Sequence, residues 1–339
     1  MLTSLPVTVT LYLYMGNGKT STKHTVLEIL RESRAAVSGE EIAQKTGVSR
    51  VSVWKAVQTL QAAGYDISSG KNGYTLTKDI CDSLYPWEFG ASENLIAHFP
   101  QTKSTMIEAR RIAECEEAEG RQNARIVTAD SQTDGHGKNN APWTTTKGSL
   151  ACTIITKNRI PVAHSQRLMM AAQIAWAEVL EKSAGRNFFV RWPNDIWTAQ
   201  GKTGGILDEL SASASVCRWL NLGMGINITE KPKRFSEVSD CVFPDGTAIT
   251  RKTLLFQFWK EFKVLETLAL EDSAALSDRW NSLCCDVKKT VCLTDADGLP
   301  TGKQAVFNGV NALGFASLTF GRETRIFPPG TVSFVKTKF

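Results

Sequence analysis

Residues 191–210 read RWPNDIWTAQGKTGGILDEL, and this stretch decides the fold of the central part of the chain. Apolar runs typical of buried strands surround an Asn-Asp pair, Asn194 and Asp195, and a lone lysine, Lys202. Buried polar groups cost free energy unless something pairs with them. The bland interpretations are an Asx turn for the pair and a lysine that reaches solvent. The functional interpretation is a ligand or metal contact for the pair and a positive charge for a carboxylate or phosphate.

Strand and helix patterns alternate on both sides of this stretch. Residues 188–198, 204–210 and 217–229 predict three consecutive strands that are antiparallel neighbours. Residues 104–120 predict a helix, and the strongly apolar residues 165–182 predict a buried one. We therefore expect a central mixed α/β domain.

The N-terminal part shows two short helical patterns joined through a glycine. Ser38 is a capping residue for the first, and Ser49 caps a second helix that runs from Arg50 towards Ala62. Its predicted apolar face is Val51, Val53, Val57 and Leu60. Residues 65–77 then read as a β-hairpin around a Lys-Asn-Gly turn. Together these features predict a winged helix-turn-helix.

The exposed side of the second helix is suited to DNA. The predicted DNA-binding residues are Arg50, Ser52, Lys55, Gln58 and, in the hairpin, Lys71. Residues 1–90 hold nine Lys and Arg against eight Asp and Glu, so charge gives little support. A small helical module that binds protein, or only packs, is the alternative.

The tail from Val287 to Val335 has short alternating runs separated by Asp-Gly, Asn-Gly and Pro-Gly, and it predicts a small C-terminal β-barrel. The fold class is thus α+β. The expected domains are a disordered leader (1–22, with Met15 a candidate true start), a winged helix-turn-helix (23–80), a linker (81–92), a central domain (93–284) and the β-barrel (285–339).

Composition excludes several classes. The chain of 339 residues is 42% hydrophobic and 22% charged, as in ordinary globular proteins, and its net charge of +5 is mild. The eight cysteines show no Cys-x-x-Cys spacing and the four histidines do not cluster with them, so we expect reduced thiols in a cytoplasmic protein and no structural zinc. No apolar run is long enough to span a membrane.

A second candidate site is the loop SQTDGHGKNNAPW, residues 131–143, between two predicted strands. Its glycines allow close approach of the backbone to a ligand, and its N–H groups and Lys138 could wrap a phosphate. A mobile surface connection is the simpler interpretation of such a loop. No Ser-His-Asp or Cys-His arrangement is visible, so a covalent enzyme nucleophile is not indicated.

In combination these segments resemble the biotin protein ligases. The segments RWPNDI, GKTGGIL and LGMGINI, in this order and spacing, are similar to that family's central motifs. KSTMIEA and QTDGHGKNNAPW are similar to its Ser-Thr-Asn segment and its Gly-Arg-Gly-Arg loop. With the N-terminal and C-terminal parts, the chain looks like the bifunctional type, in which the ligase also represses biotin synthesis genes. The resemblance implies the fold shared by class II synthetases and biotin and lipoate ligases.

The resemblance implies an activity in two steps, with biotin, ATP and Mg²⁺ as ligands. Biotin and ATP give biotinyl-adenylate and pyrophosphate, and a lysine of a biotin carboxyl carrier protein then attacks the adenylate. Positioning and charge neutralisation would perform the catalysis. The other implied partners are operator DNA and a second copy of the chain, in an at least transient homodimer.

Site residues follow from the same motifs. The implied catalytic residues are Lys202, Lys138 and Asp195, with Asp195 also a Mg²⁺ ligand. The implied biotin-binding residues are Ser104, Thr105, Gln132, Gly135, His136, Gly137, Thr153, Lys202, Gly204, Gly205 and Gly225, with Gly223 beside them in the strand floor. The implied adenylate-binding residues are Lys138, Trp143, Arg191, Asn194, Asp195 and Asn227.

The chain departs from the family in its phosphate loop, where His136, Lys138 and Ala141 replace arginines and Asn140 replaces a glycine. Lysine cannot form the bidentate fork of arginine, so we expect looser retention of the adenylate. Thr331 also stands where the family often has glutamate.

Three alternatives remain open from the sequence. The first is a lipoate–protein ligase. The second is a biotin-sensing repressor without ligase activity, and the third is a ligase whose N-terminal domain no longer meets an operator.

Overall fold

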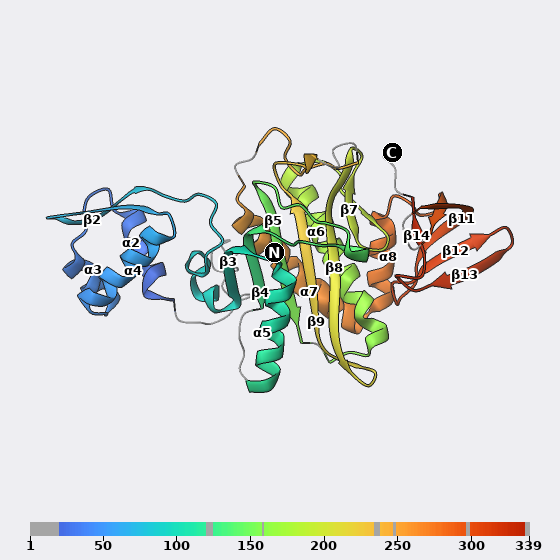
Figure 1. The fold of residues 1–339 in the computed structure, drawn as a ribbon, viewed down its shortest axis with the longest axis horizontal. Coiled ribbons are helices and arrows are strands. Elements are labelled where there is room, and N and C mark those ends of the chain that lie inside the picture. The colour runs from blue at the N-terminus through green and yellow to red at the C-terminus, as the bar shows by residue number, and fades with distance from the viewer. Residues whose placement is uncertain are drawn as a thin grey trace, which may run out of the picture. The chain divides into compact units, whose positions relative to one another are not determined.

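The computed structural model describes residues 20–119, 125–157, 159–233, 238–246, 249–295 and 299–335 (Figure 1). The chain divides into two compact units, one that ends at His98 and one that begins at Phe99. Most of the predicted leader lies outside the described residues. In the described ranges, no helix combines the length and apolar character needed to cross a membrane.

The first unit contains a helix-turn-helix followed by a hairpin. Its elements are α2 (Thr22–Glu32), α3 (Gly39–Thr46), α4 (Arg50–Ala62), β1 (Asp66–Gly70), β2 (Gly73–Lys78) and the 3₁₀ segment η1 (Pro86–Leu95). The predicted caps are confirmed: the hydroxyl of Ser38 accepts from the N–H of Glu41, and that of Ser49 accepts from the N–H of Ser52. Gly47 ends α3 in the left-handed conformation, at φ 67°, and this allows the turn into α4.

The apolar face of α4 differs from the predicted one. Val53, Val57 and Leu60 are fully buried, as expected, but Val51 is 60% exposed. Position 51 lies on the side of the helix opposite to the buried residues, because successive residues are separated by 100°. The buried stripe is completed by Ala56 instead.

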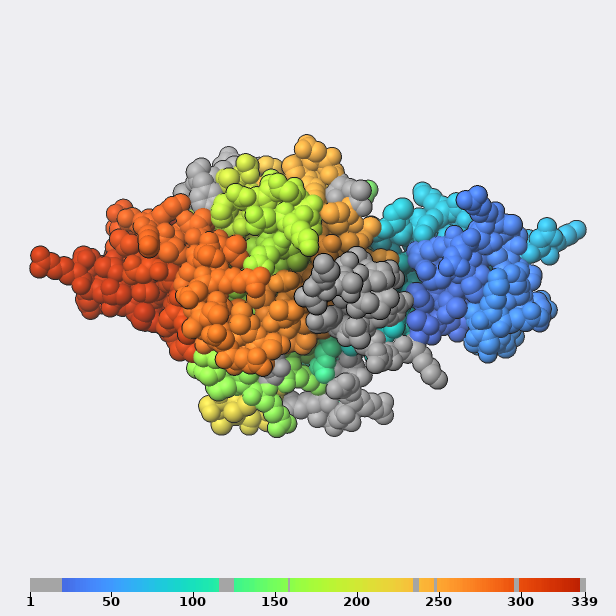
Figure 2. Space-filling model, turned by 180° about the vertical axis from the view of Figure 1, so that it is seen from behind, coloured from blue at the N-terminus to red at the C-terminus, as the bar shows by residue number. Residues whose placement is uncertain are grey.

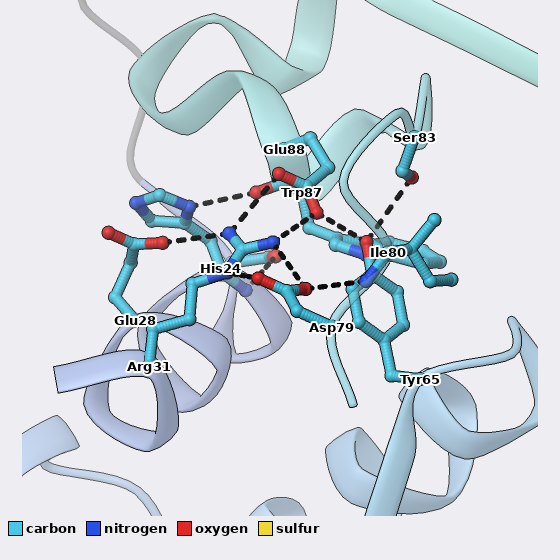
Figure 3. Close-up of polar contacts among 10 residues, drawn as sticks. His24, Glu28, Arg31, Tyr65, Asp79, Ile80, Ser83, Trp87 and Glu88 are labelled. Carbon is cyan, nitrogen blue, oxygen red and sulfur yellow. Dashed lines mark hydrogen bonds and ion pairs between the residues drawn. The ribbon is translucent and has the colours of Figure 1, made fainter. Parts of the chain in front are cut away.

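The segment predicted as a linker packs onto the first unit. Trp87 belongs to the hydrophobic core that includes Leu27 and Leu60. Figure 3 shows Arg31 of α2 between two carboxylates: it donates two hydrogen bonds to Asp79, at 2.8 and 2.9 Å, and two to Glu88, at 2.8 and 3.2 Å. This partly buried network fixes the exit of the hairpin and η1 against α2.

An antiparallel sheet forms the centre of the second unit. The strand order is β3-β4-β5-β9-β8-β7-β6. The strands are β3 (Ile96–Thr102), β4 (Ile126–Gln132), β5 (Ser149–Thr156), β6 (Phe189–Arg191), β7 (Asp195–Thr198), β8 (Gly201–Ser213) and β9 (Val216–Asn227). The pairs from β4 across to β6 are all antiparallel, which confirms the prediction of antiparallel neighbours around residues 191–227.

Helices cover this sheet. They are α5 (Thr105–Glu119), α6 (Ser165–Ala184), α7 (Arg251–Glu271) and α8 (Ser273–Leu283), with short 3₁₀ turns η2 (Lys138–Asn140) and η3 (Val162–His164). The buried helix α6 packs against β6 to β9, and α7 and α8 pack on α6. Figure 2 shows α7 and α8 (orange) at the surface of the unit, next to the C-terminal sheet (red).

The stretch predicted as one strand, residues 188–198, forms two. A cis peptide bond joins Trp192 to Pro193, and β6 and β7 pair as a tight hairpin in which Arg191 faces Asp195. Proline cannot donate to a sheet ladder, so the chain turns at Pro193. This turn carries Asn194 and Asp195.

A second sheet ends the chain, in the order β13-β12-β11-β10-β14. Its strands are β10 (Thr290–Thr294), β11 (Pro300–Val310), β12 (Ala316–Phe320), β13 (Glu323–Phe327) and β14 (Ser333–Phe334). The edge strands β13 and β14 do not pair within the described residues, so closure into the predicted barrel is not confirmed. Phe334 stacks obliquely on Trp192, at 5.2 Å between ring centroids, and thereby attaches this sheet to the β6–β7 turn.

Candidate functional site

A cavity of about 260 Å³ opens in the second unit, between the start of α5, the loop 133–143, the β6–β7 turn and the paired strands β8 and β9. Thirteen of the predicted site residues line it: Ser104, Thr105, Gln132, His136, Gly137, Lys138, Trp143, Asn194, Asp195, Lys202, Gly205, Gly223 and Gly225. Segments as far apart in sequence as Ser104 and Gly225 therefore meet at one place.

Five predicted residues do not line the cavity. Gly135, Gly204 and Asn227 contribute to its surroundings through the backbone and through hydrogen bonds inside the protein. Thr153 lies behind Thr105, to whose hydroxyl it donates at 2.8 Å.

Arg191 was expected on the nucleotide side, and the structure places it in a buried ion pair. Its guanidinium donates to both oxygens of Asp286, at 2.8 and 2.9 Å, and lies 4.5 Å from the centre of the Trp197 ring. The two side chains are only 6% and 8% exposed. Arg191 thus connects the β6–β7 hairpin to the segment after α8, which sequence spacing alone could not reveal.

The lysine of the opening stretch faces the aspartate of the same stretch. The Nζ atom of Lys202 lies 2.8 Å from Oδ1 of Asp195, and the side chains are 34% and 7% exposed. A β-carbon on Gly205 would come within 3.2 Å of Nζ, so the glycine keeps room for the lysine. Lys202 also lies 5.9 Å from the centre of the Trp143 ring. Asn194 donates to the carbonyl of Ile206 at 2.7 Å, which holds the turn against β8.

At the other end of the cavity, neutral polar groups form a chain. Oε1 of Gln132 accepts from the N–H of Thr105 at 2.8 Å and from its hydroxyl at 3.2 Å. The N-terminus of α5 is capped by Ser104, whose hydroxyl accepts from the N–H of Met106 at 3.3 Å. The hydroxyl of Thr105 bonds to Gln132 and Thr153 at the cavity wall instead of capping its own helix. This end can recognise neutral donors and acceptors.

The loop 133–143 folds over the floor as a small hairpin. The N–H of Trp143 donates to Gly135 at 2.8 Å, and the N–H of Gly137 donates to Ala141 at 2.7 Å. The indole of Trp143 lies directly against β9 at Gly225, where a β-carbon would come within 2.2 Å of it. Within the described residues, the indole N–H has no hydrogen-bond acceptor.

Lys138 supplies a second positive charge from this loop. Its Nζ donates to the hydroxyl of Ser333 at 3.2 Å, so the C-terminal sheet contacts the loop 133–143. Burial lowers the pKa of Lys138, while the charges of Asp195 and Asp208 oppose that effect. Burial raises the pKa of Asp208. Lys138 therefore brings its amine group to the wall of the cavity.

Sequence reasoning missed the apolar lining of the cavity. It consists of Met106, Pro142, Ile206, Leu207 and Met224. The clearest available signal was Gly223, where a β-carbon would come within 2.4 Å of the sulfur of Met106. A small residue in a buried strand indicates that a large group approaches there.

The thiols do not offer a nucleophile. Burial raises the pKa of Cys152 to about 12 and the pKa of Cys285 to about 12. In the described ranges, no group of three or more His, Cys, Asp or Glu side chains could hold a metal ion. A divalent cation would need further ligands, such as phosphate oxygens, beside Asp195.

The candidate DNA-binding residues all lie in the first unit. Arg50, Lys55 and Gln58 are exposed on α4, Ser52 is half-buried beside them, and Lys71 lies in the turn of the β1–β2 hairpin. Arg50 makes an exposed ion pair with Glu40 at 3.6 Å.

Comparison with known proteins agrees with both units. Residues 22–75 match the helix-turn-helix domain family, and residues 99–227 match the biotin/lipoate A/B protein ligase family. The chain is 30% identical over 215 residues to the bifunctional ligase/repressor BirA of Bacillus subtilis, covering 59% of this chain and 63% of that protein. It is 26% identical over 271 residues to BirA of Escherichia coli, covering 77% and 82%.

Among solved structures, the biotin protein ligase of Aquifex aeolicus in complex with biotin and ATP superposes with a TM-score of 0.58. The identity is 20%, over 71% of this chain and 99% of that one, and this likeness concerns the fold. The comparisons therefore show similarity to helix-turn-helix domains over residues 22–75 and to the biotin/lipoate A/B protein ligase family over residues 99–227.

Proposed function

We propose that this protein is an ATP-dependent biotin protein ligase that also binds operator DNA and represses biotin genes. In the first step, a carboxylate oxygen of biotin attacks the α-phosphorus of ATP, and pyrophosphate leaves. In the second, the amine of a lysine on a biotin carboxyl carrier protein attacks the carbonyl carbon of biotinyl-adenylate, and AMP leaves. The observation that carries this proposal is a cavity with neutral polar groups at one end, two lysines at the other and no cysteine among its lining residues.

The neutral end is suited to the ureido ring of biotin. Ser104, Thr105 and Gln132 offer hydroxyl and amide groups, with Thr153 supporting Thr105 from behind. The apolar body of biotin would pack on Met106 and on the glycine floor of β9. A cavity that is mostly apolar, with a few polar groups that fix orientation, is the usual form of a small-molecule site.

The charged end is suited to a carboxylate that meets a phosphate. Lys202 forms an ion pair with Asp195. A carboxylate or phosphate in the cavity would be a second anionic partner for its Nζ atom. Lys138 approaches from the loop above. Two fixed cations lower the repulsion between the carboxylate of biotin and the α-phosphate, which is the main electrostatic barrier to the first step. Trp143 would cover the adenylate and could donate its indole N–H to it.

Mg²⁺ fits this arrangement as a companion of ATP. Asp195 can supply one carboxylate oxygen, and Mg²⁺ commonly takes its remaining ligands from phosphates and water. The ion would neutralise phosphate charge. Arg191 and Asn227 act, in this proposal, as supports of the β6–β7 hairpin and the floor and not as contacts of the nucleotide.

The presence of Lys138 in the loop 133–143 predicts that this protein retains biotinyl-adenylate weakly. Lys138 provides a point charge where an arginine would form two parallel hydrogen bonds with a phosphate. Its contact with Ser333 makes the C-terminal sheet a support of the loop. We propose that the adenylate leaves this site faster than from a Lys138→Arg variant, and that it acylates exposed lysines of other proteins.

The first unit would connect this chemistry to transcription. The hairpin β1–β2 would act as the wing beside α4, and a dimer would place two copies of α4 on a two-fold symmetric operator. The curated relatives that support this assignment are matched over 63% of their length, at 30% and 29% identity.

The test of the ligase is formation of adenylate. The native protein is incubated with MgATP labelled at the α-phosphate, with biotin or with lipoate, and the labelled product is separated. Biotin-dependent label in biotinyl-adenylate is expected, with loss in Lys202→Ala and no loss in Lys182→Ala, an exposed lysine on α6. Product with lipoate alone would establish a lipoate ligase. Binding of biotin without any product would leave a repressor without ligase activity.

A further inference from the structure

Two large apolar side chains stand exposed on α4. Val51 is 60% exposed and Trp54 is 52% exposed. They lie in the first two turns of the helix: Val51 is on the side opposite to buried Val53, Val57 and Leu60, and Trp54 is at the edge of the exposed side. A solvated helix face usually carries polar residues, and adjacent exposed apolar groups indicate a binding surface.

The pair lies in a shallow groove of the first unit. The start of α3 forms one wall with Gly39 and Glu40, and the β1–β2 hairpin forms the other with Lys71 and Tyr74. The groove therefore lies beside the first turns of α4, between α3 and the hairpin. Val51 and Trp54 both line it.

Arg50 and Lys71 line this groove together with Glu40, and Lys55 is exposed on α4. Arg50 begins α4, Lys55 follows Trp54, and Lys71 lies across the groove. Arg50 pairs with Glu40 at 3.6 Å, but both side chains are well exposed, and such pairs are worth little. Arg50 can thus exchange Glu40 for a phosphate. The positive rim favours DNA over a protein partner or a second copy of the chain.

The apolar feature of the major groove is the C5-methyl group of thymine. In helix-turn-helix proteins, residues near the N-terminus of the second helix contact base edges. We infer that Val51 and Trp54 contact thymine methyl groups in the operator, so that part of the sequence specificity of this protein is apolar. This inference rests on the proposed DNA binding by the first unit. It explains why a DNA-reading surface can operate with so few cations.

The test compares thymine with deoxyuridine, which differs only by the methyl group. Duplexes are first enriched from a random library with the full chain in the presence of biotin and MgATP. The enriched duplex is then synthesised with each thymine replaced in turn. We expect a loss of affinity of about fourfold at each contacted position, from a methyl burial of about 0.8 kcal/mol.

Variants show whether the pair is responsible. Val51→Ala and Trp54→Ala should each weaken binding to the thymine duplex, and Trp54→Ala should remove the effect of deoxyuridine at the position it contacts. Both side chains are exposed and alanine favours helix, so the fold should persist. Val264→Ala, which removes an equally exposed valine from α7, should bind as the native chain does.

The outcomes separate the two proposals. Equal affinity for thymine and deoxyuridine duplexes, or native affinity in both alanine variants, would overturn the inference that Val51 and Trp54 contact thymine methyl groups. DNA binding by the first unit would still stand. Failure to enrich any duplex would overturn both the proposed DNA binding and the inferred thymine contacts.

Discussion

Replacement of Gly225 by alanine should disturb the cover of the cavity without disturbing the sheet. The added β-carbon would lie 2.2 Å from Cε2 and 2.4 Å from Cζ2 of Trp143. Ordinary contacts between carbon atoms begin near 3.5 Å, so the indole must move by about 1 Å or more. Overpacking of this kind costs about 1–3 kcal/mol. If the loop relaxes by leaving the ligand, affinity for biotinyl-adenylate falls by about 5- to 150-fold.

Titration calorimetry with the adenylate, or with biotin in the presence of ATP, measures this loss. The control is Gly70→Ala, because a β-carbon there would meet no atom within 4 Å. A Trp143→Ala background removes the group that the new methyl strikes, so Gly225→Ala should have almost no further effect in it. An equal loss in both backgrounds would refute the reasoning, since the effect would then not pass through the indole.

Three further predictions concern the surroundings of the cavity. Lys138→Arg should slow dissociation of the adenylate by about tenfold, the worth of one added charge-assisted hydrogen bond; a pulse-chase of labelled adenylate with an unchanged rate would contradict this. Burial raises the pKa of Asp208 in the folded chain, so the folded protein loses stability as this carboxyl ionises above pH 3.8. The melting temperature of Asp208→Asn should therefore exceed that of the native chain by more as the pH rises from 3.8. A difference independent of pH would exclude the mechanism. Arg191→Ala should lower stability by about 3–5 kcal/mol in urea denaturation by leaving Asp286 buried and unpaired, and a native urea midpoint would argue against a structural role for the pair.

Much of the site could be predicted because its chemistry lies in short motifs on adjacent strands. In the β7–β8 pair, Asp195 lies opposite Gly205 and Lys202 lies opposite Trp197, so the Lys202 side chain reaches along the neighbouring strand to Asp195. The caps at Ser38 and Ser49 were likewise local, and local hydrogen bonds decide them.

Other features depend on partners far away in the sequence. Arg191 looks like an anion-binding residue until α8 and the segment after it bring Asp286 to it. The residues around Trp87 read as a linker because their packing on α2 is visible only in three dimensions. Val51 was assigned to the core because valine favours burial, whereas its angular position on α4 points it to solvent.

The most direct test of the account is the mass of a biotin carboxyl carrier domain after incubation with the purified protein, MgATP and biotin. The account predicts a gain of one biotinyl group on the acceptor lysine, abolished by Lys202→Ala and absent with lipoate. A carrier that stays unmodified while the protein binds biotin, or one that is fully modified by the Lys202→Ala variant, would contradict the central claim that this cavity and its lysine join biotin to a protein.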